Sequence, residues 1–138
     1  MIRILATALL AVSLTASGAF ATSMGYLVKT DGLYYEMFTD VPFTGEVYEG
    51  VYRGAIKNGT REGPWVMYYG EGQLWSKGEY KNGNLEGPWV MYYPSGQLVT
   101  KGVHKNGERE GPWVWYREDG TADEDLSGTY RNGEKVSD

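Results

Sequence analysis

The chain has 138 residues, no cysteine and a formal net charge of −5 at pH 7. A length of this order fits one domain, and the absence of cysteine excludes disulfides and thiolate metal sites. The acidic balance, together with the lack of a basic cluster, argues against nucleic acid and anionic lipid as partners.

The first 21 residues have the pattern of a secretory signal peptide. Arg3 supplies a positive start, residues 4–14 are mostly apolar, and Ala19-Phe20-Ala21 has the small-x-small form that signal peptidases cut after. The alternative is a membrane anchor, but the apolar run is shorter than the ~20 residues that a span needs. We expect cleavage near Ala21 and a periplasmic or extracellular protein without an integral membrane span. The loss of Arg3 would move the formal charge from −5 to −6.

A sequence segment rich in Trp and Tyr recurs in residues 48–135. Its tryptophans are 24 residues apart, at Trp65, Trp89 and Trp113, and Asn-Gly pairs keep the same step. A fixed period in this range indicates a repeat architecture. Residues 22–47 are expected to form a lead-in and cap, and residues 136–138 a polar tail.

Each repeat is predicted to contain two strands and two turns. Residues 65–69 (WVMYY) are aromatic and β-branched, and residues 74–80 (LWSKGEY) form the return strand. Asn82-Gly83 is a strong hairpin signal because both residues tolerate positive φ. Pro88 lacks an N–H, so we expect it at the start or the edge of the next strand. The fold class is therefore all-β: an elongated, single-layer antiparallel meander of stacked hairpins, with no helix after the signal.

Glycine recurs inside the return strands, two positions before a large side chain. Residues i and i+2 lie on one face of a strand, and a glycine there weakens the strand unless something packs over it. We therefore expect an aromatic ring of an adjacent strand to cover each glycine. The predicted structural repeat positions are Trp65, Trp89, Trp113, Gly78, Gly102 and Gly128.

The chain resembles the bacterial variant of the MORN repeat at these residues. Its pattern of Tyr-Tyr-x-x-Gly-x-Leu, Gly-x-Tyr, Asn-Gly and Gly-x-Trp stands here at residues 68–74, Gly78 and Tyr80, Asn82-Gly83, and residues 87–89. The resemblance covers about residues 32–135. It implies an elongated single-layer sheet without shared catalytic chemistry, and a role as scaffold, protein binder or membrane-associated protein. Some bacterial relatives are labelled YwqK-type antitoxins, so an antitoxin-like role is one alternative.

No residue set indicates an enzyme, a cofactor or a metal site. His104, the single histidine, occupies a packing column with Tyr80, and no nucleophile set accompanies it. The carboxylates at 118–125 lack the spacing of an EF-hand loop, so an acidic solvated turn is expected. The glutamate that recurs in Glu-Gly-Pro is interpreted first as a turn requirement.

An aromatic strip is the remaining candidate for function. The fifth position of the WVMYY strand is Tyr69, Tyr93 and then Arg117, so it accepts charge and is expected to be partly exposed. Tyr and Arg are common energetic anchors of interfaces. We predict an exported, non-enzymatic module that binds protein through these residues. The alternative is a carbohydrate-binding module whose ligand is a polysaccharide. No feature predicts an oligomeric state.

Overall fold

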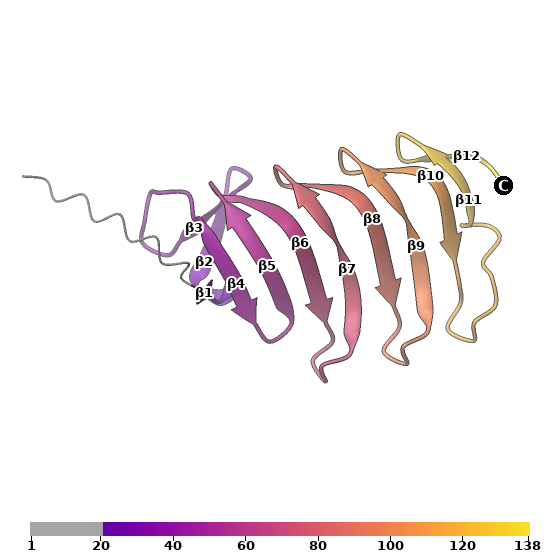
Figure 1. Ribbon diagram of the computed structural model, residues 1–138, viewed down its shortest axis with the longest axis horizontal. Helices are drawn as coiled ribbons and strands as arrows, with labels where there is room; N and C mark the ends of the chain where they lie inside the picture. The colour runs from indigo at the N-terminus through magenta and orange to yellow at the C-terminus, as the bar shows by residue number, and fades with distance from the viewer. Residues whose placement is uncertain (1–20) are drawn as a thin grey trace, which may run out of the picture.

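The computed structural model describes residues 21–138 (Figure 1). The predicted signal peptide lies outside the described residues except for Ala21. A single 3₁₀ turn, η1 (Met24–Tyr26), is the one helical element within residues 21–138. The strands are β1 (Ala21–Thr22), β2 (Leu27–Thr30), β3 (Leu33–Glu36), β4 (Gly45–Glu49), β5 (Tyr52–Lys57), β6 (Thr60–Tyr68), β7 (Leu74–Lys81), β8 (Asn84–Tyr92), β9 (Leu98–Lys105), β10 (Glu108–Trp115), β11 (Gly128–Arg131) and β12 (Glu134–Ser137).

The strands form one long open sheet and one small hairpin. The long sheet has ten strands in the order β1-β4-β5-β6-β7-β8-β9-β10-β11-β12, and β2 pairs with β3 alone. All neighbours in the long sheet are antiparallel except β1 and β4, which are parallel. Figure 1 shows the strands side by side along the long axis of the molecule. The prediction of an all-β antiparallel meander is confirmed.

The Asn-Gly turns are as tight as the sequence indicates. Asn82 has φ +50° and Gly83 has φ +84°, and the same pair of positive values recurs at the other Asn-Gly turns. Two residues with positive φ are the hallmark of the type I′ hairpin turn. The next strand therefore begins at once, so β6 starts at Thr60 and not at the predicted Trp65.

Proline lies inside these strands, which corrects the expectation that it stands at a strand start or edge. Pro88 is in the middle of β8, and the register of β8 against β7 skips between the pairs Tyr80–Leu85 and Gly78–Trp89. This bulge leaves Pro88 without a partner on β7, so its missing N–H costs no ladder bond there. Gly87, with φ +88°, makes the bulge possible because other residues rarely adopt that conformation.

The glutamate of each Glu-Gly-Pro sequence holds the neighbouring Asn-Gly turn. Glu62 accepts the backbone N–H of Asn82 at 2.8 Å, and Glu86 accepts that of Asn106 at 2.7 Å. Glu110 makes the same contact with Asn132 at 3.1 Å. The interpretation of this glutamate as a turn requirement is confirmed.

The long sheet has two faces of different chemistry. We call the side that carries Trp65, Met67 and Ser76 the tryptophan face, because these residues follow each other in register across β6 and β7. The opposite side carries Val66 and its register partner Lys77, and we call it the valine face. The tryptophan face holds the buried rings of Trp65 and Trp113, whereas the valine face presents valines that alternate in register with lysines.

A tryptophan ring covers three of the strand glycines, as predicted. A methyl group added at Gly54, Gly78 or Gly102 would overlap the indole of Trp65, Trp89 or Trp113, respectively. The prediction is wrong at Gly128, whose neighbours are the Ser137 backbone and the Lys135 side chain. The reason is that β11 pairs with the short terminal strand β12, which brings no ring to this position.

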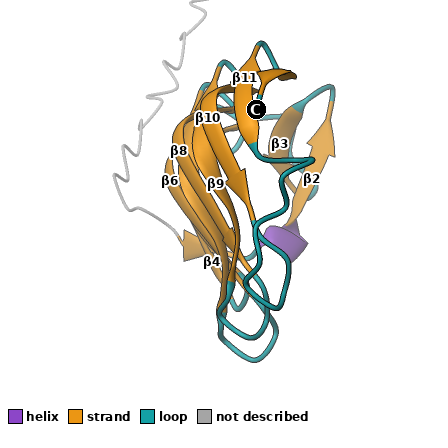
Figure 2. Ribbon diagram, turned by 90° about the vertical axis from the view of Figure 1, so that its right-hand side faces the viewer, coloured by secondary structure: helices purple, strands orange, loops and turns teal. Residues whose placement is uncertain are grey.

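The lead-in packs against the tryptophan face at the N-terminal end of the sheet. Phe43, Val47, Ile56 and Trp65 form a buried cluster there, with Leu27 of β2 packed against it. Figure 2 shows the β2–β3 hairpin on one side of the long sheet. Two expected boundaries fall inside strands, since β4 spans position 47 and β12 spans position 135.

Candidate functional site

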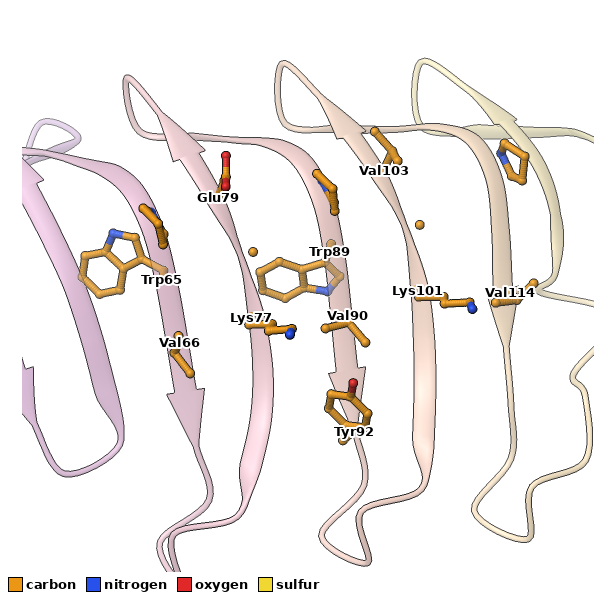
Figure 3. A pocket seen from close by; sticks show the side chains of 15 residues that line it. Trp65, Val66, Lys77, Glu79, Trp89, Val90, Tyr92, Lys101, Val103 and Val114 are labelled. Carbon is orange, nitrogen blue, oxygen red and sulfur yellow. The ribbon is translucent and has the colours of Figure 1, made fainter.

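A groove of about 680 Å³ lies on the valine face, over β6 to β10 (Figure 3). A Pro-x-Val sequence that each repeat supplies lines the groove, with Pro64, Val66, Pro88, Val90, Pro112 and Val114, and the lining also includes Trp65, Trp89, Tyr92, Lys77, Glu79 and Lys101. The valines are half-buried. A contiguous apolar surface of this kind marks a site of interaction.

A row of cations crosses the valine face among these valines. The register pairs Arg53 with Val66, Val66 with Lys77, Lys77 with Val90, Val90 with Lys101, and Lys101 with Val114. Arg53, Lys77 and Lys101 are therefore aligned, one on every second strand, and we call them the cation row. Figure 3 shows Lys77 and Lys101 at the level of the valines.

The members of the cation row have no carboxylate partner. Neither ion pair found among residues 21–138 includes Arg53, Lys77 or Lys101, and all three side chains are exposed. The Arg53 guanidinium lies 4.6 Å from the centre of the Tyr48 ring and 4.8 Å from that of Tyr68. Such cation–π contacts orient the guanidinium and leave its charge available to a ligand.

The predicted binding tyrosines are half-buried and join successive repeats. Tyr69 donates its hydroxyl to the carbonyl oxygen of Tyr92 at 2.8 Å, and Tyr93 donates to that of Tyr116 at 3.1 Å. Arg117 is exposed and lies 3.6 Å from Asp123 in an ion pair. The two phenols thus have a structural partner, and the role of the three residues in binding stays a prediction.

His104 lies in the packing column where the sequence placed it. Its ring makes edge contacts with Trp89 and Trp113, at centroid distances of 6.0 and 4.9 Å. Burial, followed by the nearby Arg109 guanidinium, lowers the pKa of His104 below 6.5. A neutral ring packed between two indoles fits a structural histidine.

The acidic segment that follows β10 forms a turn. Asp119 accepts the hydroxyl of Thr121 at 2.6 Å and the backbone N–H of Thr121 at 2.9 Å, and these two bonds lower the pKa of the Asp119 carboxyl. Asp123 forms an ion pair with Arg117 and accepts a hydrogen bond from the Leu126 N–H. Within residues 21–138, no group of three or more His, Cys, Asp or Glu side chains has the arrangement of a metal site.

A second exposed apolar surface lies on the lead-in. Phe38 is fully exposed and has φ +66°, a conformation that is rare for an aromatic residue. Val41 and Tyr26 are also exposed. This surface is small and belongs to the lead-in, whereas the groove extends across several repeats.

The net charge of the whole chain conceals the cation row, which sequence reasoning therefore missed. Arg53, Lys77 and Lys101 share the 24-residue step of the tryptophans. That spacing is the signal that would have found them, together with the Pro-x-Val sequence of each repeat. Their alignment with the valines, however, depends on the bulge at each Gly-Pro step.

A family model described as MORN repeat variant matches residues 61–82 and 85–106. Residues 61–106 therefore contain two MORN repeats of this variant type. The two MORN units supply β6 to β9, which carry Lys77, Lys101 and the centre of the groove. The resemblance drawn from the sequence is confirmed for these units.

The other comparisons add little. No curated protein sequence is similar enough to the chain to count as a match. In the part of the chain that the structure describes, no helix has the length and apolar character of a membrane span. MORN units carry no shared catalytic chemistry, so function has to be argued from the surface that they form.

Proposed function

We propose that this MORN repeat protein is a non-catalytic binding module, and that it docks a polypeptide partner in the groove of the valine face. The observation that carries the proposal is the cation row on a sheet held by repeated tight turns: the unpaired Lys77 and Lys101 line the apolar groove, and Arg53 continues the row on the adjoining strand β5. A partner with apolar groups and carboxylates would satisfy both features. Sites of this kind combine an apolar surface with a few placed polar groups.

A polypeptide fits the groove better than a carbohydrate does. Valine and proline side chains, which offer no hydrogen bonds, form the largest part of the lining, and its polar side chains are those of Lys77, Glu79, Lys101 and Tyr92. A sugar needs partners for many hydroxyls. Of the tryptophans that line the groove, Trp65 is buried and Trp89 is half-buried, so little indole surface is open to stack on a sugar. The carbohydrate alternative therefore becomes an outcome of the test.

The test compares groove variants with matched controls. Partners are captured on immobilised protein from an extract of the native host, identified by cross-linking and mass spectrometry, then purified for affinity measurements. We expect the substitution Val90→Asp in the groove to lower the affinity for the purified partner at least tenfold. Val28→Asp places the same charge on an exposed valine of the lead-in and should leave affinity unchanged. Urea unfolding of each variant verifies that it is folded.

Three outcomes would overturn the proposal. Equal affinity of folded Val90→Asp and wild type would exclude the groove. Loss of affinity in Tyr69→Phe/Tyr93→Phe with no loss in Val90→Asp would favour the aromatic strip. Retention of the protein on a polysaccharide panel, with no protein captured, would favour carbohydrate binding.

We further propose that the module acts outside the cytosol after cleavage near Ala21. The motif Ala19-Phe20-Ala21 supports this proposal. The cut would fall within β1, so Thr22 alone would remain to pair with Val47 of β4. Intact mass of protein from a periplasmic fraction should give a chain that starts near Thr22. Full-length protein confined to the cytosol would contradict export and favour an antitoxin-like role.

A further inference from the structure

From the spacing of the cation row we infer the class of partner, and this inference rests on the proposed docking in the groove. Arg53, Lys77 and Lys101 lie on β5, β7 and β9, so successive cations are separated by two strands of one sheet. Neighbouring strands are about 4.8 Å apart. The backbone positions of the cation row therefore repeat at intervals of about 9.6 Å, with a valine halfway between each pair.

A polypeptide that runs along this row must present a carboxylate on the same side at the same interval. A polyproline II helix rises about 3.1 Å per residue with three residues per turn, so every third side chain returns to one side after about 9.3 Å. A β-strand returns to one side after about 6.7 Å. In an α-helix the side-chain repeat nearest to 9.6 Å spans seven residues, or about 10.5 Å. Over the two intervals of the cation row, its carboxylates would be displaced from the cations by about 1.8 Å.

We propose that the groove binds a proline-rich acidic segment in the polyproline II conformation, with Asp or Glu at every third position. The carboxylates meet Arg53, Lys77 and Lys101, and the two residues between them lie on the valines and prolines. A polyproline II segment has little conformational freedom to lose on binding and docks in apolar grooves for that reason. The absence of ion-pair partners for the three cations leaves them available for this contact.

The chain itself offers a matched control for the charges. Lys81 and Lys105 repeat the same 24-residue step and are exposed, but they stand at the Asn-Gly ends of β7 and β9. Their register partners are Asn84 and Glu108. A ligand attracted by overall charge would respond equally to both pairs of lysines, whereas a ligand seated in the groove would respond to Lys77 and Lys101.

The experiment measures fluorescence anisotropy of labelled 12-residue peptides with the full-length protein. The probe has Asp at every third position and proline elsewhere, and a second peptide of the same composition has its four Asp residues contiguous. We expect the spaced peptide to bind at least fivefold more tightly, and more weakly as NaCl is raised. In the double variant Lys77→Ala/Lys101→Ala, affinity for the spaced peptide should fall about 2- to 30-fold, the range for two exposed ion pairs. In the control variant Lys81→Ala/Lys105→Ala, this affinity should fall less than twofold.

Several results would overturn the inference. The two peptides could bind with equal affinity, or the two double variants could lose equal affinity for the spaced peptide. A helical peptide with Asp at every seventh position, or an acidic oligosaccharide, could also bind more tightly than the spaced peptide. The failure of this inference is distinguishable from the failure of the proposed function. If no acidic peptide binds while Val90→Asp still abolishes capture of the natural partner, docking in the groove stands and the partner class is wrong.

Discussion

The replacement of Gly102 by alanine tests how the tryptophans hold the repeats together. A methyl group at Gly102 would overlap Cγ, Cδ2 and Cε2 of Trp113. Trp113 is 2% exposed, and its indole N–H donates to the Val103 carbonyl oxygen at 3.1 Å. The ring therefore has to shift within a packed environment or leave it.

These two responses set the expected loss of stability. A shift within the core costs about 1–3 kcal/mol, as overpacking generally does. Expulsion of the ring would approach the loss seen when a buried tryptophan is truncated, about 3–5 kcal/mol. We therefore expect Gly102→Ala to lower the free energy of unfolding by about 1–5 kcal/mol.

Gly70 provides the control for this substitution. No heavy atom lies within 4 Å of a methyl group placed there, and its φ is not in the left-handed region. Gly70→Ala should change stability by less than about 1 kcal/mol, and in the stabilising direction if the unfolded chain loses freedom. Urea unfolding followed by tryptophan fluorescence measures both variants. Equal midpoints for Gly102→Ala and Gly70→Ala would refute the argument that the Trp113 ring covers Gly102.

The remaining predictions concern single side chains on the tryptophan face and at the repeat junctions. Trp65→Phe should be more destabilising than Trp89→Phe by about 1 kcal/mol in urea unfolding, because of these two indoles that of Trp65 donates its N–H to a backbone carbonyl, at 3.0 Å; equal losses would contradict this role. Tyr93→Phe should cost about 0.5–1.5 kcal/mol through loss of its hydroxyl bond to the next repeat, and an unchanged midpoint would remove that bond from the account. Burial and Arg109 lower the pKa of His104, so the unfolded chain binds its proton more readily, and the stability present above about pH 6.5 declines as the pH falls below that value. His104→Tyr should therefore show a flatter stability profile between pH 7 and pH 5, and parallel profiles would contradict the shifted pKa.

Local sequence chemistry predicted much of the fold. The Asn-Gly pairs specify their own turn, since Asn82 and Gly83 adopt the positive φ values that few other residues tolerate. The pairing of Gly78 and Gly102 with rings followed from strand alternation and the period of 24 residues. Strand starts were missed because the bulge at Gly87-Pro88 lets a proline lie inside β8.

The candidate site was less accessible to sequence reasoning. Whether Lys77 lies beside Val66 and Val90 depends on how many residues each bulge inserts, and no local pattern states that number. For the tyrosine column, the sequence indicated the exposure but not the hydrogen-bond partner. Tyr69 was correctly expected to be partly exposed, but its bond to the Tyr92 carbonyl depends on how one repeat approaches the next.

Chemical-shift mapping by NMR tests the central claim, that the valine face is the docking surface, most directly. The protein is titrated with the 12-residue peptide that carries Asp at every third position. We expect the largest chemical-shift changes at Val66, Val90 and Val114 and at the side chains of Lys77 and Lys101, growing with peptide concentration. Changes concentrated at Tyr69, Tyr93 and Arg117, or around Phe38 on the lead-in, would contradict it.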